Sequence, residues 1–147
     1  MKIGFIGLGN VGGKLAGSLL RNNFKLTVYD LDPKTMENLS SKGASISKNP
    51  KELTQDSDLI ITCLPSPKIC REVMESKDGV INGLSKNKIW LEMSTTDENE
   101  VKRIGKLVKE KKAFALDGPV SGGCHRADTG NIACLLYTSP SPRDQLQ

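Results

Sequence analysis

The strongest constraint on the fold is a glycine-rich segment close to the start of the chain. Residues 7–12 read Gly-Leu-Gly-Asn-Val-Gly, which is the pattern G-x-G-x-x-G. The preceding apolar run, Lys2–Ile6, predicts a strand, and residues 11–21 carry apolar side chains at the 3.6-residue period of an amphipathic helix. A strand, a glycine turn and a helix in this order predict the first unit of a parallel α/β sheet.

Each glycine of this segment has its own predicted role. Gly7 permits the tight turn, Gly9 leaves bare backbone for a diphosphate to approach, and Gly12 lets the helix pack closely on the strand. The first helical turn presents unpaired N–H groups and the positive end of the helix dipole to the same place. The predicted contacts of this segment with a dinucleotide come from Gly7, Leu8, Gly9, Asn10, Val11 and Gly12.

An acidic residue, Asp30, ends the second predicted strand, Lys25–Tyr29. A carboxylate at this place can accept hydrogen bonds from the adenosine ribose hydroxyls, and it repels a 2′-phosphate. Because no Arg follows directly, the pattern favours NAD over NADP as the cofactor. Two alternatives stay open. The glycines and Asp30 could serve the turn and the strand end alone, or the site could bind S-adenosylmethionine in a methyltransferase. Methyltransferases, however, generally place an acid before the glycines, and Lys2–Ile6 contains none.

The rest of the chain alternates apolar runs with helical patterns. Further strands are predicted at 44–46, 59–64, 89–93 and 113–116. Helices are predicted from Asp32-Pro33 to near Gly43, from Asn49-Pro50 over a short stretch, over 67–77, and from a cap at Thr95 or Thr96 to about Lys112. This alternation predicts an α/β fold of the Rossmann type, with a doubly wound parallel sheet.

Composition and charge exclude several classes of protein. Hydrophobic residues make up 37% and charged residues 26% of the 147 residues, which is typical of a globular protein. No apolar run approaches the ~20 residues needed to span a bilayer, and the first residues lack the zones of a signal peptide. We therefore expect a cytoplasmic protein without a membrane partner. The net charge of +4 is mild and the lysines are spread out, so a nucleic-acid partner is not expected.

The cysteines do not predict a metal site. No two of them have C-x-x-C spacing, and the single histidine, His125, has no partner ligands at suitable spacing. Cys63 stands in an apolar run, where a buried free thiol is the usual role. The four cysteines are Cys63, Cys70, Cys124 and Cys134.

Three further motifs follow the later predicted strands, where open α/β sheets bind ligands. They read LPSP at 64–67, EMSTT at 92–96 and DGPVSGG at 117–123. Taken singly, the first is at least as consistent with a proline-rich turn, the second with a helix cap and the third with a glycine-rich loop.

Together with GLGNVG and VYD, these motifs resemble the β-hydroxyacid dehydrogenases, a group that includes 3-hydroxyisobutyrate dehydrogenase, tartronate semialdehyde reductase and relatives of 6-phosphogluconate dehydrogenase. The resemblance covers residues 1–133. It implies that Leu64 and Pro65 line the nicotinamide side of the cofactor cleft and that Thr95 lies beside the nicotinamide ribose.

The resemblance also implies a substrate-binding loop formed by Ser121, Gly122 and Gly123, which would hold the substrate carboxylate. Backbone N–H groups of a glycine-rich turn are suited to an anion. Two departures are visible. Gly118 stands where the family commonly has Ala, and Asp97-Glu98-Asn99 stands where a Pro often follows the Ser-Thr pair.

Members of this family continue into a helical second domain that supplies a lysine and a nearby asparagine for the substrate hydroxyl. Nothing after Ala133 matches that domain, so we name no catalytic acid or base and interpret the chain as C-terminally truncated. Residues 134–147 lose all periodicity, and we interpret them as a non-native or disordered tail outside the dinucleotide-binding domain of residues 1–133.

The resulting hypothesis is an NAD-binding part of an oxidoreductase that transfers a hydride between a nicotinamide cofactor and a small 3-hydroxy acid. This part alone is expected to be inactive, and the full-length protein is expected to be a homo-oligomer, as the resemblance implies. A non-catalytic domain that senses dinucleotides is the alternative.

Overall fold

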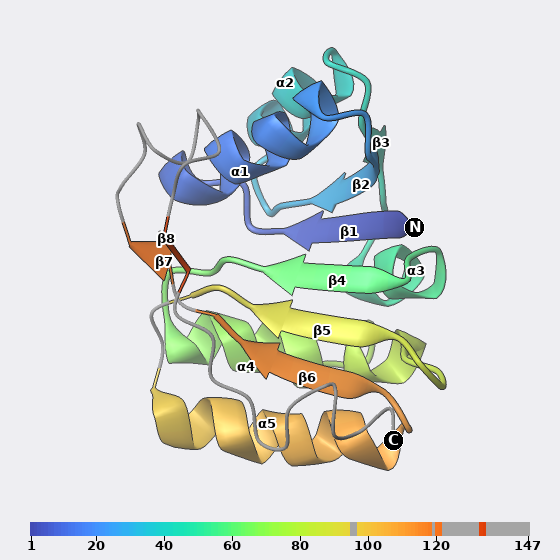
Figure 1. Cartoon of the computed structure of the whole chain (residues 1–147), viewed down its shortest axis with the longest axis vertical. Coiled ribbons are helices and arrows are strands. Elements are labelled where there is room, and N and C mark those ends of the chain that lie inside the picture. Colours follow the sequence, from blue (N-terminus) through green and yellow to red (C-terminus); the bar gives the residue numbers. More distant parts are fainter. Residues whose placement is uncertain (95–96, 119, 122–132, 135–147) are drawn as a thin grey trace.

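The computed structural model describes residues 1–94, 97–118, 120–121 and 133–134. Six parallel strands form one sheet in the order β3-β2-β1-β4-β5-β6 (Figure 1). The strands are β1 (Lys2–Ile6), β2 (Lys25–Tyr29), β3 (Ser45–Ile46), β4 (Leu59–Thr62), β5 (Ile89–Glu92) and β6 (Phe114–Asp117). The chain thus builds outward from β1 in one direction and then from β4 in the other. This confirms the predicted doubly wound Rossmann-type fold.

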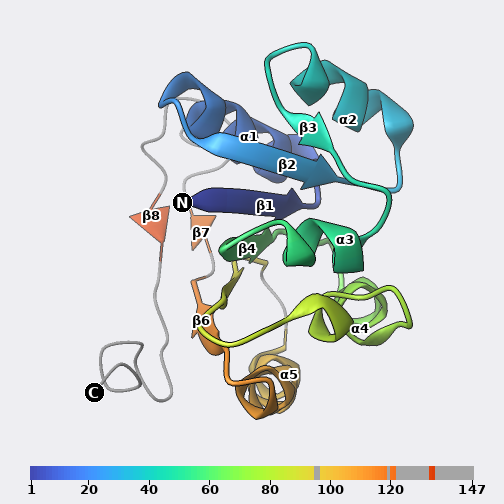
Figure 2. The ribbon, with the colours of Figure 1, turned by 90° about the vertical axis from the view of Figure 1, so that its right-hand side faces the viewer.

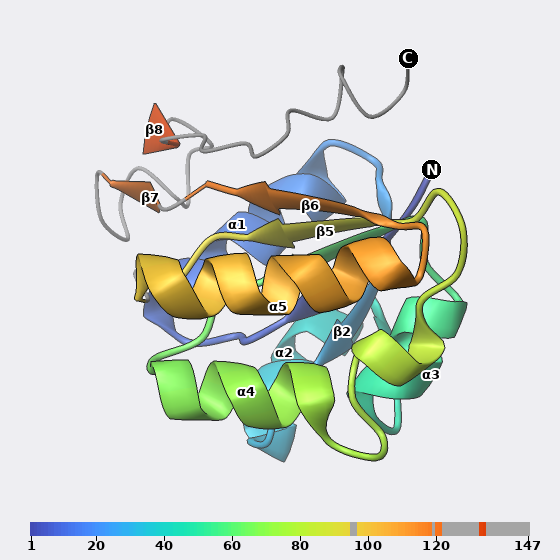
Figure 3. The same ribbon diagram turned by 90° about the horizontal axis from the view of Figure 1, so that it is seen from below.

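Helices cover both faces of the sheet. The helices are α1 (Asn10–Arg21), α2 (Pro33–Ser40), α3 (Pro50–Gln55), α4 (Pro67–Glu75) and α5 (Glu98–Glu110), with a 3₁₀ turn at Ile81–Gly83. Side chains of α1 and α2 pack against one face, and those of α3, α4 and α5 pack against the other. Figure 2 shows α2 beside β3 and α5 beside β6, at opposite ends of the sheet. Figure 3 shows α4 and α5 side by side over the second face.

Alternation along β1 explains the two hydrophobic cores. Ile3 and Phe5 are buried against α1, whereas Ile6 is buried on the opposite face with residues of α4 and α5. The second core also holds Trp90, which is fully buried. None of the helices among the described residues is long and apolar enough to cross a membrane.

Three helices begin with the same local device. The side chains of Asp32, Asn49 and Ser66 accept hydrogen bonds from backbone N–H groups of the first turns of α2, α3 and α4, at 3.0, 2.8 and 3.2 Å. A proline follows each of these capping residues, with its φ angle already suited to a helix. The starts at Asp32-Pro33 and Asn49-Pro50 match the sequence signals, and α4 begins at Pro67, as predicted for the helix over 67–77.

Helix α5 begins later than expected. We predicted a cap at Thr95 or Thr96, but the side chain of Asp97 accepts the hydrogen bond from the backbone N–H of Asn99 at 2.9 Å, and the helix starts at Glu98. Thr95 and Thr96 lie outside the described residues. Three capping-type residues stand in a row here, and the negatively charged one also interacts favourably with the helix dipole.

A small antiparallel sheet follows β6. Strand β7 (Val120–Ser121) pairs with β8 (Ala133–Cys134), with Val120 opposite Cys134. The sequence carried no signal for this pair, because two residues are too few to show a period. Residues 135–147 lie outside the described residues, and the division between a domain of residues 1–133 and a tail stays a prediction.

Candidate functional site

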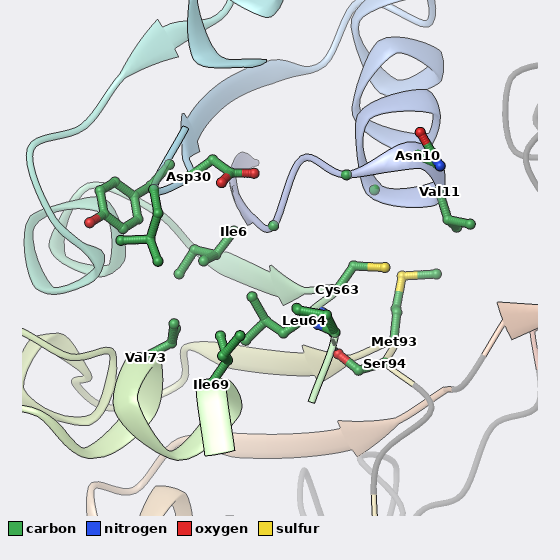
Figure 4. Close-up of a pocket in the computed structure, with 16 residues that line it drawn as sticks. Ile6, Asn10, Val11, Asp30, Cys63, Leu64, Ile69, Val73, Met93 and Ser94 are labelled. Atoms are coloured by element: carbon green, nitrogen blue, oxygen red, sulfur yellow. Dashed lines mark hydrogen bonds between the residues drawn. The ribbon is translucent and has the colours of Figure 1, made fainter. Parts of the chain in front are cut away.

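A cavity of about 520 Å³ opens at the carboxyl ends of β1, β2, β4 and β5 (Figure 4). The chain leaves β1 toward β2 on one side, while β4 lies on the other side of β1. Such a switch point leaves a crevice between the two halves of the sheet, and open α/β sheets bind their ligands there. The cavity lies where the glycine segment was predicted to act.

Gly7 forms the turn that leads out of β1. Its φ angle is +99°, and its backbone N–H donates to the carbonyl oxygen of Tyr29 at 3.1 Å. A Cβ atom at this position would lie 2.1 Å from the carbonyl oxygen of Cys63 on the neighbouring segment. Both the backbone conformation and the space therefore require glycine here.

Gly12 and Gly9 have opposite surroundings. A Cβ atom on Gly12 would lie 2.0 Å from the Gly7 carbonyl oxygen and 3.4 Å from the ring of Phe5. Helix α1 therefore makes its closest contact at Gly12 with the glycine turn, and a looser contact with the strand. A Cβ atom on Gly9 would meet nothing within 4 Å, so its backbone faces open space in the cavity wall.

The first turn of α1 is suited to an anion. Gly9 precedes the helix with an extended backbone, and the first turn contains no acidic residue. The N–H groups there, together with the positive end of the helix dipole, favour a negatively charged group. Gly9 thus provides space for a diphosphate, and the first turn of α1 provides a favourable electrostatic environment for it.

Asp30 faces the glycine segment, as Figure 4 shows. Its Oδ2 accepts a hydrogen bond from the backbone N–H of Leu8 at 2.6 Å, and its Oδ1 accepts one from the backbone N–H of Asp32 at 3.1 Å. These two bonds fix the carboxylate at the cavity. Since an ionised carboxylate offers about four acceptor positions, each oxygen retains room for a ribose hydroxyl.

Most of the other predicted residues gather at the same cavity. Leu64 and Pro65 line it, and the backbone N–H of Leu64 donates to Ser94 Oγ at 2.6 Å. Its predicted lining residues are Gly7, Gly9, Asn10, Val11, Gly12, Asp30, Leu64 and Pro65. Leu8 has its side chain buried in the core, so that only its backbone takes part.

Four further predicted positions are not among the described residues that line the cavity. Thr95, Gly122 and Gly123 lie outside the described residues. The backbone of Ser121 lies in β7, and its pairing partner is Ala133. The roles assigned to these four residues stay predictions.

One wall of the cavity is apolar and was not predicted from the sequence. Leu31, Ile69 and Val73 line it, and Leu31 is 77% exposed. Ile69 and Val73 lie one helical turn apart on α4. Residues that face the core have the same spacing as residues that line a cavity, so the sequence pattern does not distinguish the two. A leucine directly after Asp30 was the one sequence signal for this wall, because open α/β sheets bind ligands at the carboxyl ends of their strands.

The described cysteines are not suited to nucleophilic chemistry. Burial, and then the nearby Glu92 carboxylate, raise the pKa of the Cys63 thiol to about 11. The same causes raise the pKa of the Cys70 thiol further. Both thiols therefore stay protonated at neutral pH, and the thiolate is the nucleophilic form. Among the residues that the structure describes, no three His, Cys, Asp or Glu side chains gather into a metal-binding group.

Asp117 at the end of β6 gives a pH-dependent prediction. Burial, followed by the charges of Glu92 and Glu98, raises its pKa from an ordinary value of 3.8 to about 6. A raised pKa means that ionising this carboxyl costs folding free energy as the pH rises from about 4 to above 6. Asp117→Asn should therefore stabilise the protein at pH 8, by about 1 kcal/mol because solvent screens a partly exposed group.

Thermal melts at pH 4 and pH 8 check this prediction. The melting temperature of Asp117→Asn should exceed that of the wild type at pH 8, and the difference should be much smaller at pH 4. A difference of equal size at both pH values would show that Asp117 does not titrate in this way.

Comparisons with known proteins agree with this geometry. Residues 2–145 match the family model described as the NAD binding domain of 6-phosphogluconate dehydrogenase. The mitochondrial 3-hydroxyisobutyrate dehydrogenase of Mus musculus is 33% identical over 134 residues, which are 91% of this chain and 40% of that protein. The chain thus spans about 40% of the length of this curated relative.

Solved structures share the fold. A 3-hydroxyisobutyrate dehydrogenase of Salmonella typhimurium aligns with a TM-score of 0.89 at 25% identity, over 99% of this chain and 51% of that one. A 3-hydroxyisobutyrate dehydrogenase of Mycobacterium tuberculosis, solved with L-serine, aligns with a TM-score of 0.89 at 22% identity, over 99% of this chain and 49% of that one. Since the family match extends over nearly the whole sequence and the glycine cradle and Asp30 meet at one cavity, the chain belongs to the family of the NAD binding domain of 6-phosphogluconate dehydrogenase.

Proposed function

We propose that this chain is the NAD-binding part of an oxidoreductase that transfers a hydride between NAD and a small 3-hydroxy acid similar to 3-hydroxyisobutyrate. One observation carries the proposal. The Asp30 carboxylate is hydrogen-bonded to the Leu8 N–H inside the glycine segment, so the group suited to a ribose and the group suited to a diphosphate share one cavity. The family match and the name of the mouse relative support the reaction class.

The residues present fit the adenosine half of such a cofactor. The open backbone at Gly9 and the first turn of α1 would bind the diphosphate, and Asp30 would accept hydrogen bonds from the ribose hydroxyls. The apolar side chains of Leu31, Ile69 and Val73 would hold the adenine ring. When bound, a nicotinamide cofactor supplies the hydride chemistry, and the protein contributes orientation and electrostatics.

The substrate side is proposed from the family resemblance. Leu64 and Pro65 would lie along the nicotinamide half, with Thr95 beside its ribose. The loop of Ser121, Gly122 and Gly123 would bind the substrate carboxylate through backbone N–H groups. No residue of this chain is proposed as the acid or base for the substrate hydroxyl. We therefore expect the 147-residue chain to bind NAD without turning over a 3-hydroxy acid.

The same proposal covers the protein's surroundings. We place it in the cytoplasm, with a small hydroxy acid as its substrate and no nucleic-acid partner. A longer chain carrying the family's helical domain would form a homo-oligomer.

A calorimetric titration tests the proposed cofactor. NADH should bind the chain, NADPH should bind more weakly, and S-adenosylmethionine should give no heat of binding. Binding of S-adenosylmethionine without NADH would assign the cavity to a methyltransferase instead. If the chain bound neither NADH nor NADPH, this result would contradict the proposal.

Asp30→Ala should reduce the preference for NADH over NADPH. The change removes the acceptor for the ribose hydroxyls and the charge that repels a 2′-phosphate, so NADH affinity should fall ~10-fold while NADPH affinity holds or rises. Asp32→Asn is the matched control, because it removes a nearby charge and leaves an oxygen that can still cap α2. Parallel titrations with both cofactors measure the ratio. If Asp30→Ala rejects NADPH as strongly as Asp32→Asn does, then Asp30 is not the discriminating residue.

A further inference from the structure

A carboxylate with no exposed surface lies directly behind the cavity. Glu92, the last residue of β5, is fully buried. Its Oε2 accepts hydrogen bonds from the Thr62 hydroxyl at 2.9 Å and from the Cys70 thiol at 3.1 Å. Its Oε1 accepts one from the backbone N–H of Ser94 at 2.6 Å. Three elements, β4, α4 and the segment after β5, thus meet at this one side chain.

Both carboxylate oxygens of Glu92 accept hydrogen bonds from the surrounding residues. The Thr62 hydroxyl that donates to Glu92 accepts in turn a hydrogen bond from the indole N–H of Trp90 at 2.9 Å. The polar groups of Glu92, Thr62 and Trp90 are thus connected by hydrogen bonds. A buried carboxylate is costly unless its oxygens are hydrogen-bonded, and an apolar residue of similar volume is often at least as stable at such a place. Stability alone therefore does not explain an acidic residue here.

The link from Glu92 to the cavity runs through Ser94. Glu92 holds the backbone N–H of Ser94, and Ser94 Oγ accepts the hydrogen bond from the backbone N–H of Leu64 at 2.6 Å. Both Ser94 and Leu64 line the cavity (Figure 4). Two hydrogen bonds thus connect the buried carboxylate with the wall formed by Leu64 and Pro65.

We propose that Glu92 is a positioning residue for the cofactor site, which acts through Ser94 to fix the segment of Leu64 and Pro65. Its effect on cofactor affinity rests on the function proposed above, whereas its effect on the Leu64 amide does not. A role limited to holding the core together predicts lower stability alone. A positioning role predicts a local change at Leu64 that general destabilisation does not produce.

Three variants separate these roles. Glu92→Gln keeps the shape of the side chain but replaces one acceptor oxygen by an NH₂ group, which donates. The Ser94 N–H and the Thr62 hydroxyl then cannot both keep the hydrogen bonds that they donate to the two oxygens of Glu92. Ser94→Ala leaves the buried carboxylate in place and removes the acceptor of the Leu64 N–H. Val108→Ala, a fully buried position in the same core cluster as Trp90, is the control for general destabilisation.

Amide hydrogen exchange at Leu64, measured by NMR without cofactor, is the first readout. Glu92→Gln and Ser94→Ala should each speed this exchange ~10-fold beyond the change in Val108→Ala, and the double variant should add little. The second readout is NADH affinity, which should fall ~10-fold in both variants and stay at the wild-type value in Val108→Ala.

The outcomes can be told apart. Leu64 exchange in Ser94→Ala equal to that in Val108→Ala would overturn the inference, even if Glu92→Gln does not fold. Wild-type NADH affinity in a folded Glu92→Gln would overturn it as well. If the wild-type chain binds no NADH, the proposed function fails and the cofactor part of this inference fails with it, while the Leu64 exchange still reports on the link through Ser94.

Discussion

Replacement of Gly9 by valine should abolish dinucleotide binding and leave the fold intact. A Cβ atom at Gly9 would meet nothing within 4 Å among the described residues, and Gly9 lines the cavity. The free protein therefore has room for the isopropyl group. The diphosphate does not, because the added carbons would occupy the space beside the N–H groups of α1. We expect an affinity loss of more than ~100-fold for NADH, with a melting temperature close to wild type.

Calorimetry and thermal melts measure the two parts of this prediction. Gly17→Ala on the same helix is the matched control, since its Cβ atom would meet only the side chain of Arg21 at an ordinary 3.6 Å. This control should bind NADH normally. Wild-type affinity in Gly9→Val would mean that the diphosphate does not bind at residues 7–12, and the proposed function would have to be abandoned.

Gly12→Ala should have the opposite effect and destabilise the protein strongly. The new Cβ atom would lie 2.0 Å from the carbonyl oxygen and 3.0 Å from the carbonyl carbon of Gly7, which are backbone atoms. The turn cannot yield easily, because Gly7 itself packs against the carbonyl oxygen of Cys63. Helix α1 must shift away from the sheet, at a cost of about 3 kcal/mol or more.

Urea denaturation checks this expectation, with a lower midpoint and an unchanged slope in Gly12→Ala. Gly17→Ala again serves as the control, because alanine should stabilise a helix interior by roughly 0.5–1 kcal/mol relative to glycine. Wild-type stability in Gly12→Ala would show that a Cβ atom at this position does not come within 2.0 Å of the Gly7 carbonyl oxygen.

Local signals in the sequence were enough to predict the architecture. The order of strands and helices follows from apolar periods, and the starts of α2 and α3 follow from a capping residue and a proline next to each other. The glycine segment and Asp30 could be assigned to one site because both directly follow neighbouring parallel strands, β1 and β2. Interactions between residues close in sequence carry this information.

The helix starting after β5 shows where local signals stop being sufficient. Thr95, Thr96 and Asp97 are all capping-type residues, and the structure assigns the cap to Asp97. Propensity ranks Asp above Thr by only a small margin, and the charge of Asp97 adds a favourable interaction with the helix dipole. Differences of this size are too small for the sequence alone to place the start of a helix to the residue.

The sequence by itself determined the fold class, the glycine cradle and the place of Asp30, because short-range periodicity and turn chemistry encode them. Only the tertiary structure decided that Ile69 and Val73 face the cavity and that Glu92 is buried behind it. It also decided that Ser94 holds Leu64, thirty residues away. These contacts join β4, β5 and α4 across the sheet, so they depend on packing between distant segments, which no local pattern in the sequence specifies.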